Sequence, residues 1–270
     1  MRINQNVAAY NAWRNLSVTD SSMNKSLEKL SSGFRINRAA DDAAGLAVSE
    51  KMRAQVRGLN KATSNAMDGI SLIQTAEGAL NETHSILQRM RELAVQSAND
   101  TLTNPDRDQL QTEVTGLIEE ITRISTATEF NGQTLLGGDF TGKTFQIGAN
   151  TGQIVDVAIT SQSATTLGVG TIGIDSKASA VDSIALIDTA IDTVSTNRAN
   201  LGAIQNRLEH TIANLGVAAE NLSAAESRVR DVDMAKEMSE FTRTQILMQA
   251  GTAMLAQANM KPQTVLKLLG

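Results

Sequence analysis

Mostly apolar residues recur at alternating steps of four and three along residues 52–87. The positions are Met52, Val56, Leu59, Thr63, Ala66, Ile70, Ile73, Glu77, Leu80, His84 and Leu87. This spacing is the a and d repeat of a coiled coil, in which one side of a helix packs against another helix. It predicts a single long helix over residues 45–99.

A second row with the same spacing lies downstream and predicts a long helix over 180–226. Its positions are Ile184, Ile187, Ile191, Val194, Arg198, Leu201, Gln205, Leu208, Ile212, Leu215, Ala219 and Leu222. Residues 179–182 (Ser-Ala-Val-Asp) match a capping box at its start. A shorter helix is predicted over 105–128. There Asn104 can cap, Pro105 suits the first helical position and Asp106 favours the positive end of the helix dipole.

The segment between the second and third predicted helices, residues 131–175, is rich in Gly, Thr, Ser and Asn. Residues 144–147 and 154–159 read as strands, and 148–152 as the turn between them. They predict a small β-hairpin at about 140–162, which should lean on the helices because an isolated hairpin is marginal in water. The Ser- and Thr-rich residues 160–176 read as a solvated loop that O-glycosylation could decorate.

Both ends of the chain also predict helices. Leu16, Met23, Leu27 and Leu30 share one helical stripe, whereas apolar residues surround most of the segment 232–260. A helix that is apolar all round must be buried all round, and one partner helix cannot cover it. The ends therefore predict a subunit that polymerises. We expect its assembly contacts at Leu27, Leu30, Phe241, Ile246, Leu247, Met254 and Leu255.

Composition narrows the class of protein. Of the 270 residues 41% are hydrophobic but only 3% aromatic, and there are two prolines, which suits long helices packed side by side. The formal net charge of −5 argues against a nucleic-acid partner. The sequence contains no run of about 18 apolar residues, so it predicts no membrane span. The start of the chain lacks the apolar core of a secretory signal peptide. With no cysteine, disulfides and thiolate metal sites are excluded.

One nucleotide-binding motif is present but is not accepted. Residues 137–144 (GGDFTGKT) match the phosphate-binding loop pattern, which needs a helix immediately after it. The following residues alternate like a strand, so we expect a Gly-rich turn before the hairpin. His84 and His210 lie in different predicted helices, and the pair Asp41 and Asp42 reads as a helix cap. No cofactor, metal site or catalytic group is predicted.

Several blocks resemble the bacterial flagellin family. They are LSSGFRINRAADDAAGL at 30–46, QRMRELAVQSAN at 88–99, FNG at 130–132, FQIGAN at 145–150, and NLSAAESRVRDVDMA at 221–235. The resemblance extends through QIL at 245–247 and AQAN at 256–259. Trp13 departs from the pattern, since flagellins are usually poor in tryptophan.

The resemblance implies a structural subunit of the flagellar filament and not an enzyme. It implies a mainly α fold, with a long coiled-coil-like helical bundle, a small β-hairpin and paired terminal helices. Residues 1–42 and 229–270 would form the inner-core domain, and 43–228 the outer-core bundle. Few residues separate the helices, so we expect a short form without extra surface domains.

Partners and location are also implied by the resemblance. The chain would be secreted through the flagellar export apparatus, with an export chaperone on residues 232–269. It would meet copies of itself, the filament cap and the hook-junction proteins. Arg89, Leu93 and Glu113 match positions through which some flagellins bind a host Toll-like receptor. The tail, residues 265–269, resembles the segment sensed by cytosolic inflammasome receptors.

Two alternative functions stay open from the residues alone. A hook–filament junction protein shares the terminal helices, although the C-terminal signature argues against it. An intracellular coiled-coil scaffold fits the heptad spacing but not the blocks.

Overall fold

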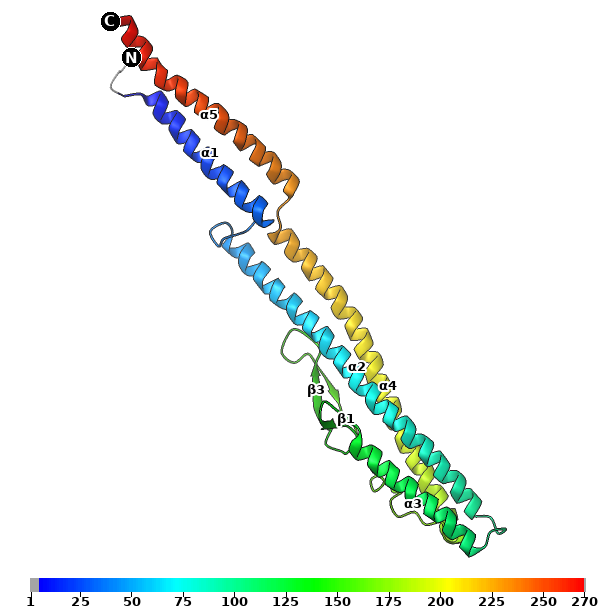
Figure 1. The fold of residues 1–270 in the computed structure, drawn as a ribbon. Helices are drawn as coiled ribbons and strands as arrows, with labels where there is room; N and C mark the ends of the chain where they lie inside the picture. Colours follow the sequence, from blue (N-terminus) through cyan, green and yellow to red (C-terminus); the bar gives the residue numbers. More distant parts are fainter. Residues whose placement is uncertain (1–4, 270) are drawn as a thin grey trace. The chain divides into compact units, whose positions relative to one another are not determined.

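The structure is a computed structural model that describes residues 5–269, with side chains for residues 5–260. It is mainly helical (Figure 1), and its elements follow the predicted order. They are α1 (Val7–Ser32), α2 (Ala43–Ser97), α3 (Asn104–Ala127), β1 (Glu129–Phe130), β2 (Gln133–Thr134), β3 (Lys143–Gln146), β4 (Ile154–Val157), α4 (Lys177–Arg230) and α5 (Met234–Leu269). The predicted fold class is confirmed. The chain forms two compact units, Met1–Gln55 with Asn221–Gly270, and Val56–Glu220.

In the first unit, α1 and α5 form an antiparallel pair (Figure 1). At one end Asn6 Nδ2 donates to the carbonyl oxygen of Ala258 at 2.8 Å. At the other end Lys29 Nζ lies 3.6 Å from a carboxylate oxygen of Glu237. α1 stops at Gly33, whose φ of 73° places it in the left-handed region that favours glycine. The predicted pairing of the terminal helices is therefore present.

The core of the second unit lies where α2 meets α4, the hairpin and α3. Most buried positions of α2 again follow the four–three spacing: Ala62, Ala66, Gly69, Ile73, Ala76, Leu80, Thr83, Leu87, Met90, Ala94 and Ser97. Ser49, Leu72 and Leu93 are buried outside this row. Ala66, Ile73, Leu80 and Leu87 were predicted. The positions between them and before them lie one residue earlier than the predicted Thr63, Ile70, Glu77 and His84, and the row continues beyond Leu87, the last predicted position. Small residues there let neighbours approach closely, since a Cβ added to Gly69 would lie within about 3.5 Å of both Phe145 and Leu208.

The hairpin forms as predicted and lies on α2. β3 and β4 are antiparallel, with Phe145 opposite Val155. Asn65 Nδ2 of α2 donates to the carbonyl oxygen of Gln146 at 3.1 Å. β4 ends at Val157, two residues earlier than predicted. A second, smaller strand pair, β1–β2, turns at Asn131 and Gly132, and it was not predicted.

Residues 160–176 do not form the solvated loop expected from their Ser and Thr content. Ala164, Leu167, Val169, Ile172 and Ile174 are buried. Gln111 of α3 receives the Ile174 N–H and donates to the Ile172 carbonyl oxygen, so this segment is fixed against the helices. The polar residues between these apolar ones face outward. Because they outnumber the apolar residues, the sequence of this segment resembles that of a solvated loop.

The predicted caps of α3 and α4 are wrong by one and three residues, and the predicted cap of α2, the pair Asp41 and Asp42, holds in part. Thr103, not Asn104, precedes α3, and Asp106 Oδ2 accepts hydrogen bonds from the N–H and hydroxyl of Thr103. Ser176, not Ser179, caps α4, and its Oγ accepts from the Ser179 N–H. Asp42 does cap α2.

Candidate polymerisation surface and receptor-contact residues

The terminal helices carry large apolar side chains that the α1–α5 pair leaves exposed. Of the residues expected to make assembly contacts, Leu27, Ile246, Leu247 and Met254 are exposed, with Met254 at 66%. Leu30, Phe241 and Leu255 are partly buried. The expected set therefore divides into side chains on the open surface and side chains near the contact between the two helices.

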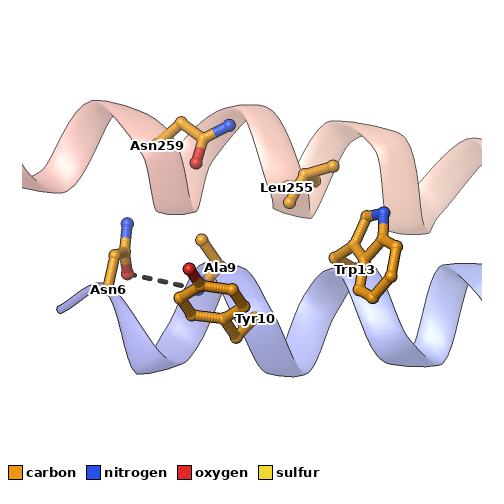
Figure 2. Close-up of a pocket in the computed structure, with 6 residues that line it drawn as sticks. All are labelled: Asn6, Ala9, Tyr10, Trp13, Leu255 and Asn259. Atoms are coloured by element: carbon orange, nitrogen blue, oxygen red, sulfur yellow. Dashed lines mark hydrogen bonds between the residues drawn. The ribbon is translucent and has the colours of Figure 1, made fainter.

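An open groove of about 410 Å³ lies between α1 and α5 near their free ends. Figure 2 shows its lining: Asn6, Ala9, Tyr10 and Trp13 from α1, and Leu255 and Asn259 from α5. Tyr10 and Trp13 are 71% and 62% exposed, although large aromatic side chains are normally covered. In the sequence Trp13 stands out only as a departure from a family pattern, and Tyr10 does not stand out at all. Their three-residue spacing on a helix was the available signal.

The parts of α1 and α5 that line this groove carry no charged side chains. No Asp, Glu, Lys or Arg occurs in residues 3–13 or 244–260. An exposed apolar surface of this kind marks a place where another molecule binds. Since it offers no charge for a charged partner, a second apolar surface fits it best.

Arg89 and Glu113, two of the three residues expected to contact a receptor, form an exposed ion pair. Arg89 on α2 donates through Nε to Glu113 Oε1 on α3 at 2.9 Å. Its Nη1 donates to Glu92 Oε2 at 3.1 Å. These hydrogen bonds, to Glu113 first and then to Glu92, raise the pKa of the Arg89 guanidinium. α2 and α3 thus present one composite charged patch.

Leu93 is not part of that surface. Its exposed fraction is 1%, and it belongs to the apolar core of the second unit. The sequence could not reveal this, because α2 has contacts on more than one side. The tail residues 265–269 have side chains outside the part of the chain that the structure describes.

The rejected chemical signals lie in ordinary structural settings. The Gly-rich residues 137–144 lead into β3, not into a helix, as expected. His84 is partly buried with Nε2 3.0 Å from Gln88 Nε2, and His210 is exposed. Among the described residues, no three His, Cys, Asp or Glu side chains are grouped to hold a metal. Within residues 5–269, none of the helices has the length and apolar character that crossing a bilayer requires.

Paired terminal helices with an uncovered, uncharged apolar surface define a class: a helical subunit of a self-assembling polymer. The model of the bacterial flagellin N-terminal helical region matches residues 3–141, and that of the C-terminal helical region matches residues 184–269. The chain belongs to the bacterial flagellin family. It is therefore a structural component of the bacterial flagellum and not an enzyme.

Relatives match along the whole chain. A flagellin of Halalkalibacterium halodurans is 57% identical over 271 residues, and one of Bacillus subtilis is 52% identical over 303, each match covering both chains fully. The flagellar filament 33 kDa core protein of Treponema phagedenis is 52% identical, again with full coverage of both chains.

Solved structures show the same likeness. The crystal structure of Bacillus cereus flagellin is 34% identical with a TM-score of 0.52, covering 60% of this chain and 94% of that one. A flagellar hook-associated protein of Vibrio parahaemolyticus is 16% identical with a TM-score of 0.60, covering 71% of this chain and all of that one. The second likeness is one of fold alone.

Proposed function

We propose that this chain polymerises into the flagellar filament through the surface formed by α1 and α5. The supporting observation is the set of exposed apolar side chains on an uncharged part of both helices. In this proposal residues 1–42 and 229–270 form the inner core of the filament, and residues 43–228 form its outer core. The filament serves swimming motility.

The driving force is burial of apolar surface. Full burial of one large apolar side chain contributes about 1.5–3 kcal/mol. Leu27, Ile246, Leu247 and Met254 each have surface left to bury, and Tyr10 and Trp13 add aromatic area. Because every subunit repeats these contacts, modest individual contributions are enough to hold a long polymer.

Seeded polymerisation tests this proposal. Purified chain is added to short filament fragments in high salt and followed by negative-stain microscopy, beside a truncation to residues 43–228. Trp13 is the single tryptophan, so its emission reports directly on the groove. We expect long filaments from the full chain only, and the emission of the full chain should shift to the blue as it polymerises; the truncation lacks Trp13 and is judged by microscopy alone. Soluble dimers or short stubs from the full chain would count against polymerisation into the filament and favour a hook–filament junction role.

A point substitution locates the contact. Leu247→Asp places a charge on the exposed surface of α5 and should abolish elongation while leaving secretion intact. Val181→Asp is the matched control, since Val181 is equally exposed on α4 in the second unit. Normal filaments from the Leu247→Asp variant would count against the inner-core assignment.

We further propose export through the flagellar apparatus, with a chaperone covering α5 before assembly. An exposed apolar helix in a free subunit needs a cover to avoid aggregation. In a motile strain that carries Leu247→Asp, we expect this chain in the culture medium as monomer. The filament cap and the hook-junction proteins complete its set of flagellar partners.

The Arg89–Glu113 pair supports recognition of the monomer by the flagellin-sensing Toll-like receptor. The ion pair bridges α2 and α3 on an exposed surface, and arginine is a common interface anchor. In receptor-reporter cells, Arg89→Ala and Glu113→Gln monomers should signal more weakly than the parent. Arg123→Ala is the control, because Arg123 forms an exposed pair with Glu120 that lies on α3 alone. Equal signalling from the parent, Arg89→Ala and Glu113→Gln would contradict this role.

Leu93→Ala is a poor probe of the receptor contact. Truncating a buried leucine costs about 2–5 kcal/mol of stability. Weak signalling from that variant would therefore report on folding as well as on the contact.

A further inference from the structure

Exposed methionines are concentrated on α5. The chain has ten methionines and no cysteine. Among the residues whose side chains the structure describes, five methionines are about half exposed or more: Met67, Met234, Met238, Met254 and Met260. Four of these five lie on α5, whereas Met90 of α2 is fully buried. The surface proposed for polymerisation is thus also the surface richest in accessible thioethers.

An accessible thioether reacts with two-electron oxidants such as hydrogen peroxide. The sulfur lone pair attacks one peroxide oxygen, the O–O bond breaks, an S–O bond forms and water leaves. The sulfur is oxidised and the peroxide is reduced. The product, methionine sulfoxide, replaces a flexible apolar group by a polar one that requires hydrogen bonds when it is buried.

The positions of these methionines determine the consequence. Met254 adjoins Leu255, which lines the groove, and lies within the uncharged residues 244–260. Met260 closes that stretch, and Met234 and Met238 form the first turns of α5. A sulfoxide at any of them would have to lose its water when another subunit covers α5.

We propose that Met234, Met238, Met254 and Met260 form an oxidation-sensitive site that controls incorporation into the polymer. Oxidation of the free subunit at this site prevents its addition to a filament, and a subunit already incorporated is protected. This inference rests on the proposed polymerisation through α1 and α5. Restoration falls to the methionine sulfoxide reductases, which reverse the change.

A partition experiment tests the proposal on the unaltered full chain. Free chain is treated briefly with hydrogen peroxide, mixed with filament fragments and sedimented, and sulfoxide at each methionine is measured by peptide mass spectrometry in the pellet and the supernatant. We expect sulfoxide at Met234, Met238, Met254 and Met260 to be about tenfold or more enriched in the supernatant. Sulfoxide at Met67 should be equally divided, and Met90 should stay unoxidised. Equal division at α5, or equal enrichment at Met67, would overturn the assignment.

Two further arms establish the cause. Treating the oxidised chain with both reductase classes should restore elongation. A variant with Met→Leu at the four positions of the proposed site keeps similar volume and should elongate seeds after peroxide treatment as well as before. If this variant elongates seeds before treatment but peroxide then stops it as fully as the parent, the site lies elsewhere and the proposal fails. Failure of the untreated parent chain to elongate seeds would instead refute the proposed function itself, and this inference with it.

Discussion

A Cβ added to Gly58 of α2 would lie 2.8 Å from the Cβ of Ala149, in the turn between β3 and β4. Real Cβ atoms essentially never approach so closely, so the hairpin turn can occupy this place only because residue 58 has no side chain. Together with the hydrogen bond from Asn65 to Gln146, this contact seats the hairpin on the helix.

Gly58→Ala should therefore destabilise the chain, although alanine normally stabilises a helix interior by about 0.5–1 kcal/mol over glycine. Gly78→Ala is the matched control in the same helix, because nothing lies within 4 Å of the Cβ it would add. We expect Gly78→Ala to raise the midpoint of urea unfolding and Gly58→Ala to lower it. A similar rise from both would show that the turn moves aside freely.

The sequence predicted the helices because their heptad spacing is long and little interrupted. It placed half of the core row of α2 one residue too late, because Ala62, Gly69 and Ala76 carry little hydrophobic signal. Their small size is what lets the neighbouring elements pack closely. Residues 160–176 were misread for a related reason, since Ser and Thr separate the apolar residues that face inward.

The candidate sites were predictable to a different extent. Exposure of Ile246 and Leu247 could be predicted because the segment is apolar on most sides and a single partner helix can cover only one of them. Burial of Leu93 did not follow, because it depends on which side of α2 each neighbouring element occupies. The groove at Tyr10 and Trp13 required the register of α1 against α5, which no single segment contains.

Arg107 of α3 is a buried arginine whose partners, within the part of the chain that the structure describes, are backbone carbonyl oxygens and the Asn104 side-chain oxygen. It is 7% exposed, and its guanidinium donates to the carbonyl oxygens of Ser97 and Asn99 at the end of α2, each at 3.0 Å. Arg107→Ala should cost roughly 2–3 kcal/mol, since these carbonyls lose their partner. Arg107→Lys should recover only part, because an ammonium cannot reproduce the planar fork. Chemical denaturation of both variants against the parent measures this, and equal stability of the parent and the alanine variant would contradict it.

Acid should weaken the start of α3. Hydrogen bonds from the Thr103 hydroxyl and then its N–H lower the pKa of the Asp106 carboxyl below its usual 3.8. The unfolded chain therefore takes up this proton first, so the stabilisation is present above pH 3.8 and is lost as the pH falls through the lower folded-state pKa.

Asp106→Asn mimics the protonated form and tests this dependence. The parent should melt at a higher temperature than the variant at neutral pH, and the two melting temperatures should converge below pH 3.8. Asp108→Asn is the control in the same first turns, since the Asp108 side chain has no hydrogen-bond partner among the described residues. A gap that stayed constant with pH would assign the effect to something other than this proton.

Phe34 lies in the connection between α1 and α2, residues 33–42, which meets the connection between α4 and α5, residues 231–233. Its ring is close to two arginines. The Arg230 guanidinium carbon lies 4.7 Å from the centre of the Phe34 ring, and that of Arg53 lies 6.0 Å away. Glu226 pairs with Arg53 at 2.8 Å, which holds that cation beside the ring. The Arg35 N–H next to Phe34 donates to the Arg230 carbonyl oxygen at 2.7 Å.

Phe34→Leu keeps an apolar side chain but removes the ring face, so it should weaken this junction by roughly 0.5–2 kcal/mol. Phe34→Tyr keeps the ring and is the control. Hydrogen exchange read at the Arg35 and Val232 amides, which hold the two connections together, should be faster in Phe34→Leu and unchanged in Phe34→Tyr. Exchange at the same rate in both variants would mean that the backbone hydrogen bonds hold this junction without the ring.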